Sequence, residues 1–393
     1  MKRIVVWSPN YAPELTGIPP LVTDACEWLH ARGHGVDVIT TFPNYPERRI
    51  RPDYRGRFCV REERNGVRVN RWWLRVRSRE RLIDKGLYEL TAATLPLPWA
   101  VPMFQRADAV LCVVPTLLAS VYATAFSRAP VVLWVQDLVL SASESVVMSG
   151  LARSIVRGFR VLERRAVARA KAVVVCSPGF RDEFASWGIE TNNVRVAYNW
   201  ADLNGIVVKP PPASPKVRFL YAGNIGYTQG LETLVHAAND VGDSIRVSLV
   251  GDGNAVGRVR REVAMTRNVS LAPPVQREQF PDLLSAHDVH VVVQRKVAAG
   301  ANLPSKIASY LASGRPVIAS IAADTPAAEL LRESGAAVIV EPESPHALAR
   351  AMEELRDDGT RRLELGRRAR AFAQARLAKE PAMLTIEQAL LGD

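Results

Sequence analysis

The chain has 393 residues, of which 48% are hydrophobic and 23% are charged, as in an ordinary globular protein. This length predicts about two domains, and no apolar run approaches the roughly 18 residues of a membrane-spanning helix. The net charge of +11 favours an anionic membrane or substrate as partner, unless the basic residues only decorate solvated faces. No nucleic-acid-binding module is present, so we expect no nucleic-acid partner.

The N-terminus and the cysteines indicate the compartment. The chain starts with Met-Lys-Arg, but the apolar run that follows is too short for a signal peptide, so we expect a cytoplasmic protein. No CxxC pair occurs, and most cysteines lie in or beside apolar runs, which favours buried free thiols over metal or disulfide. The cysteines are Cys26, Cys59, Cys112 and Cys176.

Strands and helices alternate along residues 1–205, which we expect to form the first domain. A strand over 4–7, a helix over 20–31 and a strand over 36–40 make a βαβ unit, which predicts a parallel sheet. Ligands of such sheets lie beyond the carboxyl ends of the strands, so the loop with Glu14 and Gly17 should face a ligand. Further strands are expected at 109–114, 131–135, 172–176 and 194–197, and helices at 116–126, 151–170 and 177–187.

Residues 48–104 interrupt this alternation. Their first part is dense in arginine and tryptophan, and an apolar segment broken by prolines follows over 87–104. This composition is typical of a protein that rests on an anionic bilayer, so we expect a membrane-facing insertion here. The alternative is a solvated basic hairpin with a helix buried in the domain core. The residues expected to contact the membrane are Arg71, Trp72, Trp73 and Arg75.

The second half repeats the alternation after a proline-rich linker at 209–215. We expect a second domain over 206–375 and a C-terminal helix over 376–393 that packs back on the first domain. The predicted architecture is α/β, with two doubly wound Rossmann-like domains. Strands are expected at 217–222, 245–250, 289–293, 317–320 and 337–340.

A glycine-rich turn follows the strand that ends at Ala222. Gly223, Gly226 and Gly230 stand between this strand and the next helix, an arrangement that lets a phosphate approach the backbone and the helix N-terminus. The spacing matches neither the dinucleotide fingerprint nor a P-loop, and an ordinary turn is the alternative.

Other residues of this half could complete an anion site. Lys306 lies in the first turn of a helix that begins near Pro304, where a lysine opposes the helix dipole, so a bound anion is favoured there. Arg295 follows a strand and is a second candidate cation, with simple solvent exposure as the alternative. Gly251 and Asp252 end another strand, where they either shape a nucleotide pocket or form a plain turn.

Seven stretches, in order along nearly the whole chain, resemble the glycosyltransferases of family 4, which have the GT-B fold. The resemblance is strongest for the exopolysaccharide and O-antigen branch, of colanic-acid type and similar to N-acetylfucosamine transferases. Enzymes of that branch act on polyprenyl-diphosphate-linked acceptors at the inner face of the bacterial membrane. The stretches are Tyr11–Gly17, Glu27–His34, Gln136–Leu138, Asn199–Trp200, Tyr221–Thr233, Val250–Gly253 and Leu303–Ile318.

This resemblance implies two domains that face each other across a cleft, and a retaining, metal-independent transferase without a cofactor. The donor would be a nucleoside-diphosphate sugar, with UDP favoured, and the acceptor a lipid-linked or other small molecule at the cytoplasmic membrane face. The glycine turn and Pro304–Ser305 would hold the diphosphate, and Lys306 would stabilise it as it leaves. The donor-side residues would be Gly223, Asn224, Gly226, Gln229, Gly251, Asp252, Arg295, Pro304, Ser305, Lys306 and Glu329.

On the acceptor side, the resemblance places Asp137 near the donor sugar and the acceptor. Asp137 would act as a base or orient the acceptor hydroxyl, whereas its alternative role is to cap the next segment. Glu14 and Gly17 would face the same substrate. Asn199 would line the cleft or satisfy local backbone groups.

The chain also departs from the family pattern. Asn224 and Gln229 stand where many members carry Arg and Lys, and Ala301 and Ser309 occupy the places of two glutamates. Glu329 could replace a glutamate only if its loop turns inward. The usual Trp-Pro-Glu is replaced by residues 139–141, and no Asp-x-Asp occurs.

These departures keep other functions open. They are a transferase acting on a secondary metabolite, a non-catalytic GT-B scaffold and, less favoured, a nucleotide-sugar epimerase.

Overall fold

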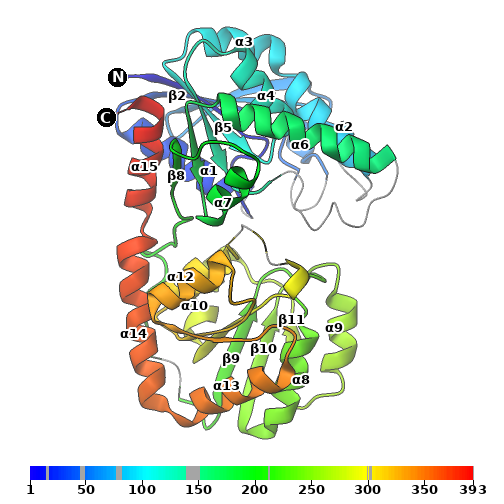
Figure 1. Cartoon of the computed structure of the whole chain (residues 1–393), viewed down its shortest axis with the longest axis vertical. Helices are drawn as coiled ribbons and strands as arrows, with labels where there is room; N and C mark the ends of the chain where they lie inside the picture. Colours follow the sequence, from blue (N-terminus) through cyan, green and yellow to red (C-terminus); the bar gives the residue numbers. More distant parts are fainter. Residues whose placement is uncertain are drawn as a thin grey trace. The chain divides into compact units, whose positions relative to one another are not determined.

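The computed structural model describes residues 1–14, 17–44, 49–76, 82–138, 151–210, 213–298, 300 and 303–392. The chain forms two compact units, each built on one sheet (Figure 1). The first unit contains Met1–Ala197 with Ala382–Asp393, and the second contains Tyr198–Pro381. The prediction of two α/β domains is therefore confirmed.

Among the described residues, the sheet of the first unit has eight strands in the order β3-β4-β2-β1-β5-β6-β7-β8. All neighbours are parallel except β3 and β4. The inner strands are continuous buried apolar runs, as expected when helices cover both faces of a parallel sheet. The strands are β1 Arg3–Trp7, β2 Gly35–Thr41, β3 Cys59–Arg64, β4 Val67–Trp72, β5 Ala109–Val114, β6 Val131–Val135, β7 Ala172–Val175 and β8 Val194–Val196.

Helices connect these strands, and α4 packs against α2, α3 and α6. The end of the chain also belongs here, because Glu387 accepts hydrogen bonds from Arg32 at 2.9 Å and from His34 at 3.0 Å. The helices are α1 Pro19–Ala31, α2 Leu82–Thr94, α3 Leu97–Gln105, α4 Leu117–Phe126, α6 Leu151–Arg169, α7 Gly179–Ser186 and α15 Lys379–Leu391.

The segment expected to face a membrane forms the hairpin β3–β4, followed by α2 and α3. The hairpin is not a free solvated element, because β4 pairs in parallel with β2 and so lies inside the sheet. Arg71 and Trp72 are 1% and 4% exposed, so the expectation of membrane contact is wrong for these two residues. Trp73 and Arg75 are exposed, and their membrane contact stays a prediction.

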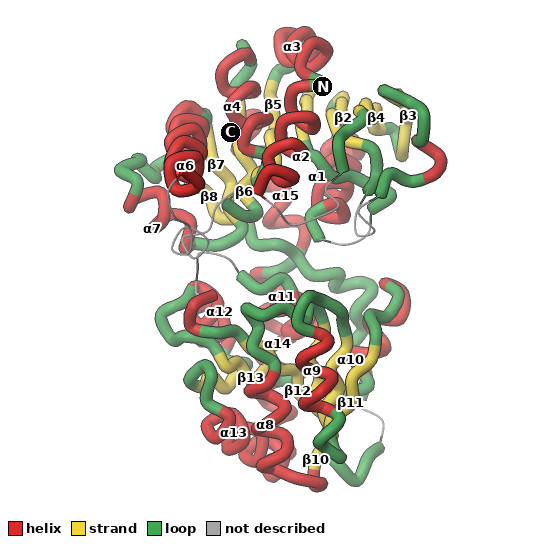
Figure 2. Tube along the Cα trace, turned by 90° about the vertical axis from the view of Figure 1, so that its right-hand side faces the viewer, coloured by secondary structure: helices red, strands yellow, loops and turns green. Residues whose placement is uncertain are grey.

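The described sheet of the second unit has six parallel strands in the order β11-β10-β9-β12-β13-β14. One face is buried under α8, α9 and α13, and the other under α11, α12 and α14. Figure 2 shows these elements along the chain trace. The strands are β9 Val217–Ala222, β10 Ile245–Val250, β11 Val269–Ala272, β12 Val289–Val293, β13 Val317–Ser320 and β14 Ala337–Val340. The helices are α8 Glu232–Val241, α9 Val256–Val263, α10 Phe280–Ser285, α11 Lys306–Ala312, α12 Pro326–Ser334, α13 Pro345–Asp357 and α14 Gly359–Arg376.

The second unit begins before the proline-rich segment. Ala201 and Ile206 are buried in its core, and the amide of Ala201 donates to the carbonyl of Leu377 at 3.0 Å. Arg370 donates to the carbonyl of Ile206 at 2.9 Å. Residues 201–205 are thus part of the second unit and not of the first domain, where they were expected, because they bury apolar side chains in the core of the second unit.

Strand order locates the ligand edge of each sheet. In the first unit β1 pairs with both β2 and β5, and in the second β9 pairs with both β10 and β12. The order of strands reverses at these pairs, and open α/β sheets bind ligands beyond the carboxyl ends of strands at such reversals. The glycine turn after β9 and the loop after β12 lie at that position in the second unit.

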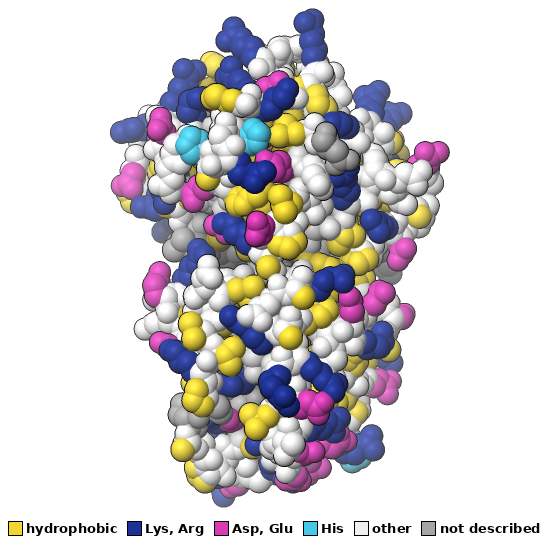
Figure 3. Space-filling model, turned by 90° about the vertical axis from the view of Figure 1, so that its left-hand side faces the viewer, with side chains coloured by type: hydrophobic (Ala, Val, Ile, Leu, Met, Phe, Trp, Pro, Cys, Tyr) yellow, Lys and Arg dark blue, Asp and Glu magenta, His cyan; other side chains and the backbone are white. Residues whose placement is uncertain are grey.

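Two further observations bear on the partners. None of the helices in the described part of the chain has the length and apolarity needed to cross a bilayer. On the face shown in Figure 3, Lys and Arg side chains are spread among acidic and apolar ones and do not gather into one basic patch.

Candidate active site

Lys306 lies against the end of β9. Its Nζ is 3.6 Å from the ring centroid of Tyr221, and a Cβ built on Gly223 would be 3.2 Å from the same Nζ. Tyr310, one turn further along α11, holds the helix to this strand. Its hydroxyl accepts from the amide of Ala222 at 2.7 Å and donates to the carbonyl of Ala222 at 3.2 Å. The start of α11 is therefore fixed beside the glycine turn.

The surroundings of Lys306 disfavour its positive charge. Burial lowers the pKa of Lys306 to about 7. No carboxylate in the described part of the chain forms an ion pair with it, and its place at the start of α11 opposes the helix dipole. The ring face of Tyr221 is its compensating contact. An anion bound here would relieve this electrostatic cost.

Most of the glycine turn is occupied with its own structure. The amide of Ile225 donates to the carbonyl of Asp252 at 2.8 Å, and the amide of Gly226 donates to Oε1 of Gln229 at 3.0 Å. The amide of Tyr227 donates to Oδ1 of Asn254 at 3.2 Å. These three N–H groups are therefore not directed at a ligand, and Gln229 serves to shape the turn.

Asn224 belongs to the same arrangement. Its Nδ2 donates to Oε1 of Gln229 at 3.4 Å, and its carbonyl accepts from the hydroxyl of Tyr221 at 2.5 Å. The two positions at which many family members carry cations thus brace the turn in this chain.

Gly251 and Asp252 support the turn from the neighbouring strand β10. Gly251 has φ +157°, and a Cβ there would collide with the carbonyl oxygen of Gly223. The amide of Gly223 in turn donates to the carbonyl of Val250 at 2.9 Å. Glycine is required at position 251 because two backbone segments touch there.

Arg295 differs from Lys306 in having counter-ions. It forms ion pairs with Glu232 at 3.4 Å and with Glu343 at 3.2 Å, and its Nε donates to the carbonyl of Tyr227 at 2.8 Å. A Cβ on Gly230 would be 2.9 Å from Cγ of Arg295. Arg295 therefore clamps the turn, and its charge is largely balanced by carboxylates.

The remaining donor-side residues lie near the start of two helices. Pro304 and Ser305 precede α11, where the carbonyl of Pro304 accepts from the amide of Ile307 at 3.0 Å. Glu329 is exposed on the first turn of α12. The position of Ala301 lies outside the described residues.

In the first unit, Asp137 is exposed directly after β6, and its Oδ1 accepts from the amide of Leu138 at 2.8 Å. Burial raises the pKa of Cys176 to about 12, and the charge of Asp137 adds to that rise, so the two residues are neighbours. The segment that Asp137 would cap, residues 139–150, is outside the described chain, as is the replaced Trp-Pro-Glu.

The other acceptor-side residues are divided between the units. Glu14 is buried, and its carboxylate accepts from Nδ2 of Asn10 at 2.9 Å and from the amide of Asn44 at 2.8 Å. It joins the loop after β1 to the loop after β2. Gly17 is exposed with φ +85°. Asn199 belongs to the second unit rather than to the expected first one.

Sequence reasoning missed Tyr221 and Tyr310. The spacing of Lys306 and Tyr310, four residues apart on one helix, places them on the same face and could have indicated that both meet the glycine turn.

The comparisons with known proteins agree with this geometry. Residues 16–200 match the glycosyl transferase 4-like domain, and residues 216–358 match the glycosyl transferases group 1. A putative colanic acid biosynthesis glycosyl transferase, WcaI of Escherichia coli (strain K12), is 30% identical over 88% of this chain and 90% of its own length. The chain belongs to glycosyltransferase family 4. It is a glycosyltransferase, and the resemblance to this family is confirmed.

Solved structures place the fold. Sucrose-phosphate synthase from Thermosynechococcus elongatus superposes with a TM-score of 0.74 at 18% identity, over 99% of this chain and 98% of that chain. Anabaena HepE, solved in complex with UDP, superposes with a TM-score of 0.73 at 16% identity, over 99% of both chains. The predicted GT-B fold is thereby confirmed.

Proposed function

We propose that this glycosyltransferase moves a sugar from a nucleoside-diphosphate sugar to a lipid-linked acceptor in the synthesis of a surface polysaccharide. The main support for the donor site is Lys306, which has no carboxylate partner among the described residues. It lies beside Gly223, where the strand order of the second sheet reverses. HepE was solved with UDP, which supports UDP as the nucleotide. The name of WcaI, which refers to colanic acid biosynthesis, supports the polysaccharide role.

Lys306 would act on the leaving group. Negative charge develops on the diphosphate as the bond to the sugar breaks, and an ammonium already in place stabilises that charge without reorganisation. Because the pKa of Lys306 is lowered to about 7, the free protein holds it only partly protonated near neutral pH. A bound diphosphate raises that pKa, so the lysine takes up a proton as the donor binds. We propose that this charge serves in place of a divalent cation.

Asp137 would act on the acceptor. It is exposed at the carboxyl end of β6, where it can orient the attacking hydroxyl or take its proton. Retention of anomeric configuration, attachment to the cytoplasmic face of the membrane and the absence of a cofactor complete the proposal by analogy with the family.

Thermal stabilisation by nucleotides tests the donor site. A ligand that binds only the folded state raises the unfolding temperature by mass action. We expect UDP and UDP-sugars to raise it more than GDP or ADP, and Lys306→Met to abolish the rise. Lys209→Met is the matched control, since it removes an exposed lysine of the same unit that pairs with Asp282 at 2.8 Å. A chain that responds to none of these nucleotides would contradict the proposed donor site at Lys306.

A further inference from the structure

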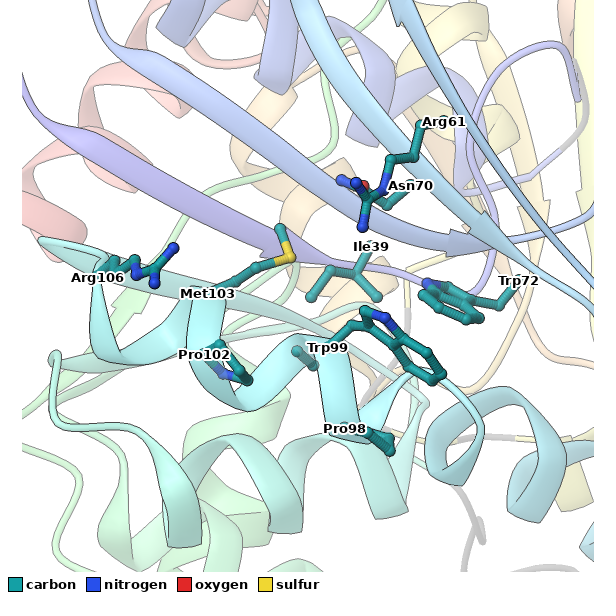
Figure 4. A pocket seen from close by; sticks show the side chains of 10 residues that line it. Ile39, Arg61, Asn70, Trp72, Pro98, Trp99, Pro102, Met103 and Arg106 are labelled. Carbon is teal, nitrogen blue, oxygen red and sulfur yellow. The ribbon is translucent and has the colours of Figure 1, made fainter.

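The first unit contains a pocket that the donor and acceptor residues do not use. Its volume is about 210 Å³, and it lies between the strands β2, β3 and β4 and the helix α3 (Figure 4). Side chains from the sheet are Ile39, Arg61, Asn70 and Trp72, and those from α3 and its end are Pro98, Trp99, Ala100, Pro102, Met103 and Arg106.

Side chains from three neighbouring strands form the floor of the pocket. Asn70 of β4 stands opposite Ile39 of β2 on one side and Arg61 of β3 on the other, so the three side chains make one row across the sheet. Trp72 lies two residues beyond Asn70 and therefore on the same face. The apolar side chains of α3 cover this row, which makes the middle of the pocket apolar.

The charged groups that line the pocket are both cationic, namely Arg61 and Arg106. No carboxylate in the described chain forms an ion pair with Arg61 or Arg106, and no acidic side chain lines the pocket. Figure 4 shows the guanidinium of Arg61 beside Asn70 and above Ile39, with Arg106 beyond Met103 at the other end. An apolar strip flanked by unbalanced guanidinium groups is complementary to a molecule with an apolar body and an anionic group.

Exposed aromatic rings surround the same place. The ring of Trp72 contacts Phe58 at 5.9 Å and Trp99 at 4.4 Å between centroids. Trp72 is buried, but Phe58 is 51% and Trp99 44% exposed, so both ends of this row of rings reach solvent. Exposed aromatic side chains beside arginines are typical of the interface of an anionic bilayer.

We propose that this pocket binds one anionic phospholipid of the bilayer surface, with its phosphate at Arg61 and its first acyl carbons along Trp99 and Met103. The volume is below the roughly 300 Å³ of pockets that enclose a drug-sized ligand, so it takes only the phosphate and the neighbouring carbons of the lipid. The site rests on the proposed function in that it attaches the enzyme to the membrane that carries its acceptor. Arg61 and Trp99 of the pocket thus provide the cationic and the exposed aromatic membrane contacts that were expected of the buried Arg71 and Trp72.

Vesicle binding tests the pocket. The wild-type chain is sedimented with phosphatidylcholine vesicles that contain or lack phosphatidylglycerol. We expect binding only to the anionic vesicles. Arg61→Ala/Arg106→Ala should weaken this binding by about 25-fold, because each arginine near the membrane surface contributes about five-fold by itself. Both side chains are exposed at the pocket, so the variant should fold. Trp99→Ser should weaken binding further without changing the charge.

The control is Arg128→Ala/Arg169→Ala, which removes the same charge from two exposed arginines of the first unit outside the pocket. Equal loss in both double variants would mean diffuse electrostatic adsorption and would overturn the proposal. Binding of monomeric dihexanoyl-phosphatidylglycerol without binding of vesicles would also overturn it. The response to UDP separates this inference from the proposed function. Suppose that the wild type and Arg61→Ala/Arg106→Ala both bind UDP normally, but neither protein binds vesicles. In that case the pocket inference fails and the proposed function does not.

Discussion

The ammonium of Lys306 stands 3.6 Å above the ring of Tyr221, which ties the first turn of α11 to the end of β9. The same tyrosine donates from its hydroxyl to the carbonyl of Asn224 at 2.5 Å, inside the glycine turn. One side chain therefore both compensates the charge of the lysine and fixes the turn beside it. The two contacts can be separated by substitution.

Tyr221→Phe keeps the ring face and loses the hydrogen bond, whereas Tyr221→Leu loses both. A cation–π contact contributes about 0.5–2 kcal/mol, so we expect Tyr221→Leu to weaken UDP binding by about 2- to 30-fold, with a smaller effect for Tyr221→Phe. Isothermal titration calorimetry with UDP measures both. Equal affinity of Tyr221→Leu and the wild type would show that the ring does not assist Lys306.

Donor affinity should fall as pH rises above 7. The pKa of Lys306 is lowered to about 7 in the free protein, and a bound diphosphate raises it, so binding takes up a proton between these two values. The fall is at most ten-fold per pH unit. UDP-glucose is the suitable ligand, because its diphosphate does not titrate between pH 7 and 8.5. A pH-independent affinity, or a slope that persists in Lys306→Met, would contradict this role.

The lowered pKa of Lys306 should also make the stability of the free protein depend on pH. Between pH 7 and the unfolded lysine value near 10.4, the unfolded chain holds the proton that the folded chain has lost. Stability of the second unit should therefore rise with pH in this window, and Lys306→Met should remove that rise. Chemical denaturation at several pH values measures it, with Lys209→Met as the variant that should keep the slope.

Arg71 should matter for stability and not for membrane contact. It is buried, pairs with Glu62 at 2.8 Å and also donates to the carbonyl of Ala12. Removing Arg71 leaves the carbonyl of Ala12 without its donor and Glu62, whose side chain is 30% exposed, without its partner, which destabilises by about 1–3 kcal/mol. We expect Arg71→Ala to lower the unfolding temperature of the first unit by several degrees. The exposed Arg75 is its control, and Arg75→Ala should change little.

Gly251→Ala tests the contact between the two turns of the second unit. The new Cβ would collide with the carbonyl of Gly223, so the glycine turn must move and UDP binding should be lost. Gly257→Ala, on the exposed face of α9 with no atom near its Cβ, should keep binding and add about 0.5–1 kcal/mol of stability. Normal UDP affinity in Gly251→Ala would show that the geometry of this turn does not support the site.

Parallel strands were the most predictable part of the fold. The run Val131–Val135 is apolar throughout because helices cover both faces of the sheet, and its bounds follow from the sequence alone. The sequence pattern does not predict the strand Val269–Ala272, because this strand is short, lies at the sheet edge and is only partly buried. Strand Val67–Trp72 was obscured by its arginines, which are usually exposed.

Residues of the candidate site could be predicted only where a local sequence pattern indicates their role. Lys306 stands against a helix dipole, and that conflict is visible in the sequence. The sequence does not reveal that the charge of Arg295 is neutralised, because its partners Glu232 and Glu343 lie 63 and 48 residues away along the chain. Nor does local sequence reveal that Gln229 turns its side chain onto the amide of Gly226, because an exposed polar side chain was equally compatible with the pattern.

Acceptor-dependent release of UDP tests the central claim most directly. UDP-sugars are incubated with the wild type, Lys306→Met and Lys209→Met, each with and without a polyprenyl-diphosphate-linked saccharide. We expect release that depends on the acceptor, is retained in Lys209→Met and falls about 100- to 1,000-fold in Lys306→Met, as when a preorganised stabiliser of transition-state charge is removed. Release at the same rate without acceptor, or an unchanged rate in Lys306→Met, would contradict transfer assisted by this lysine.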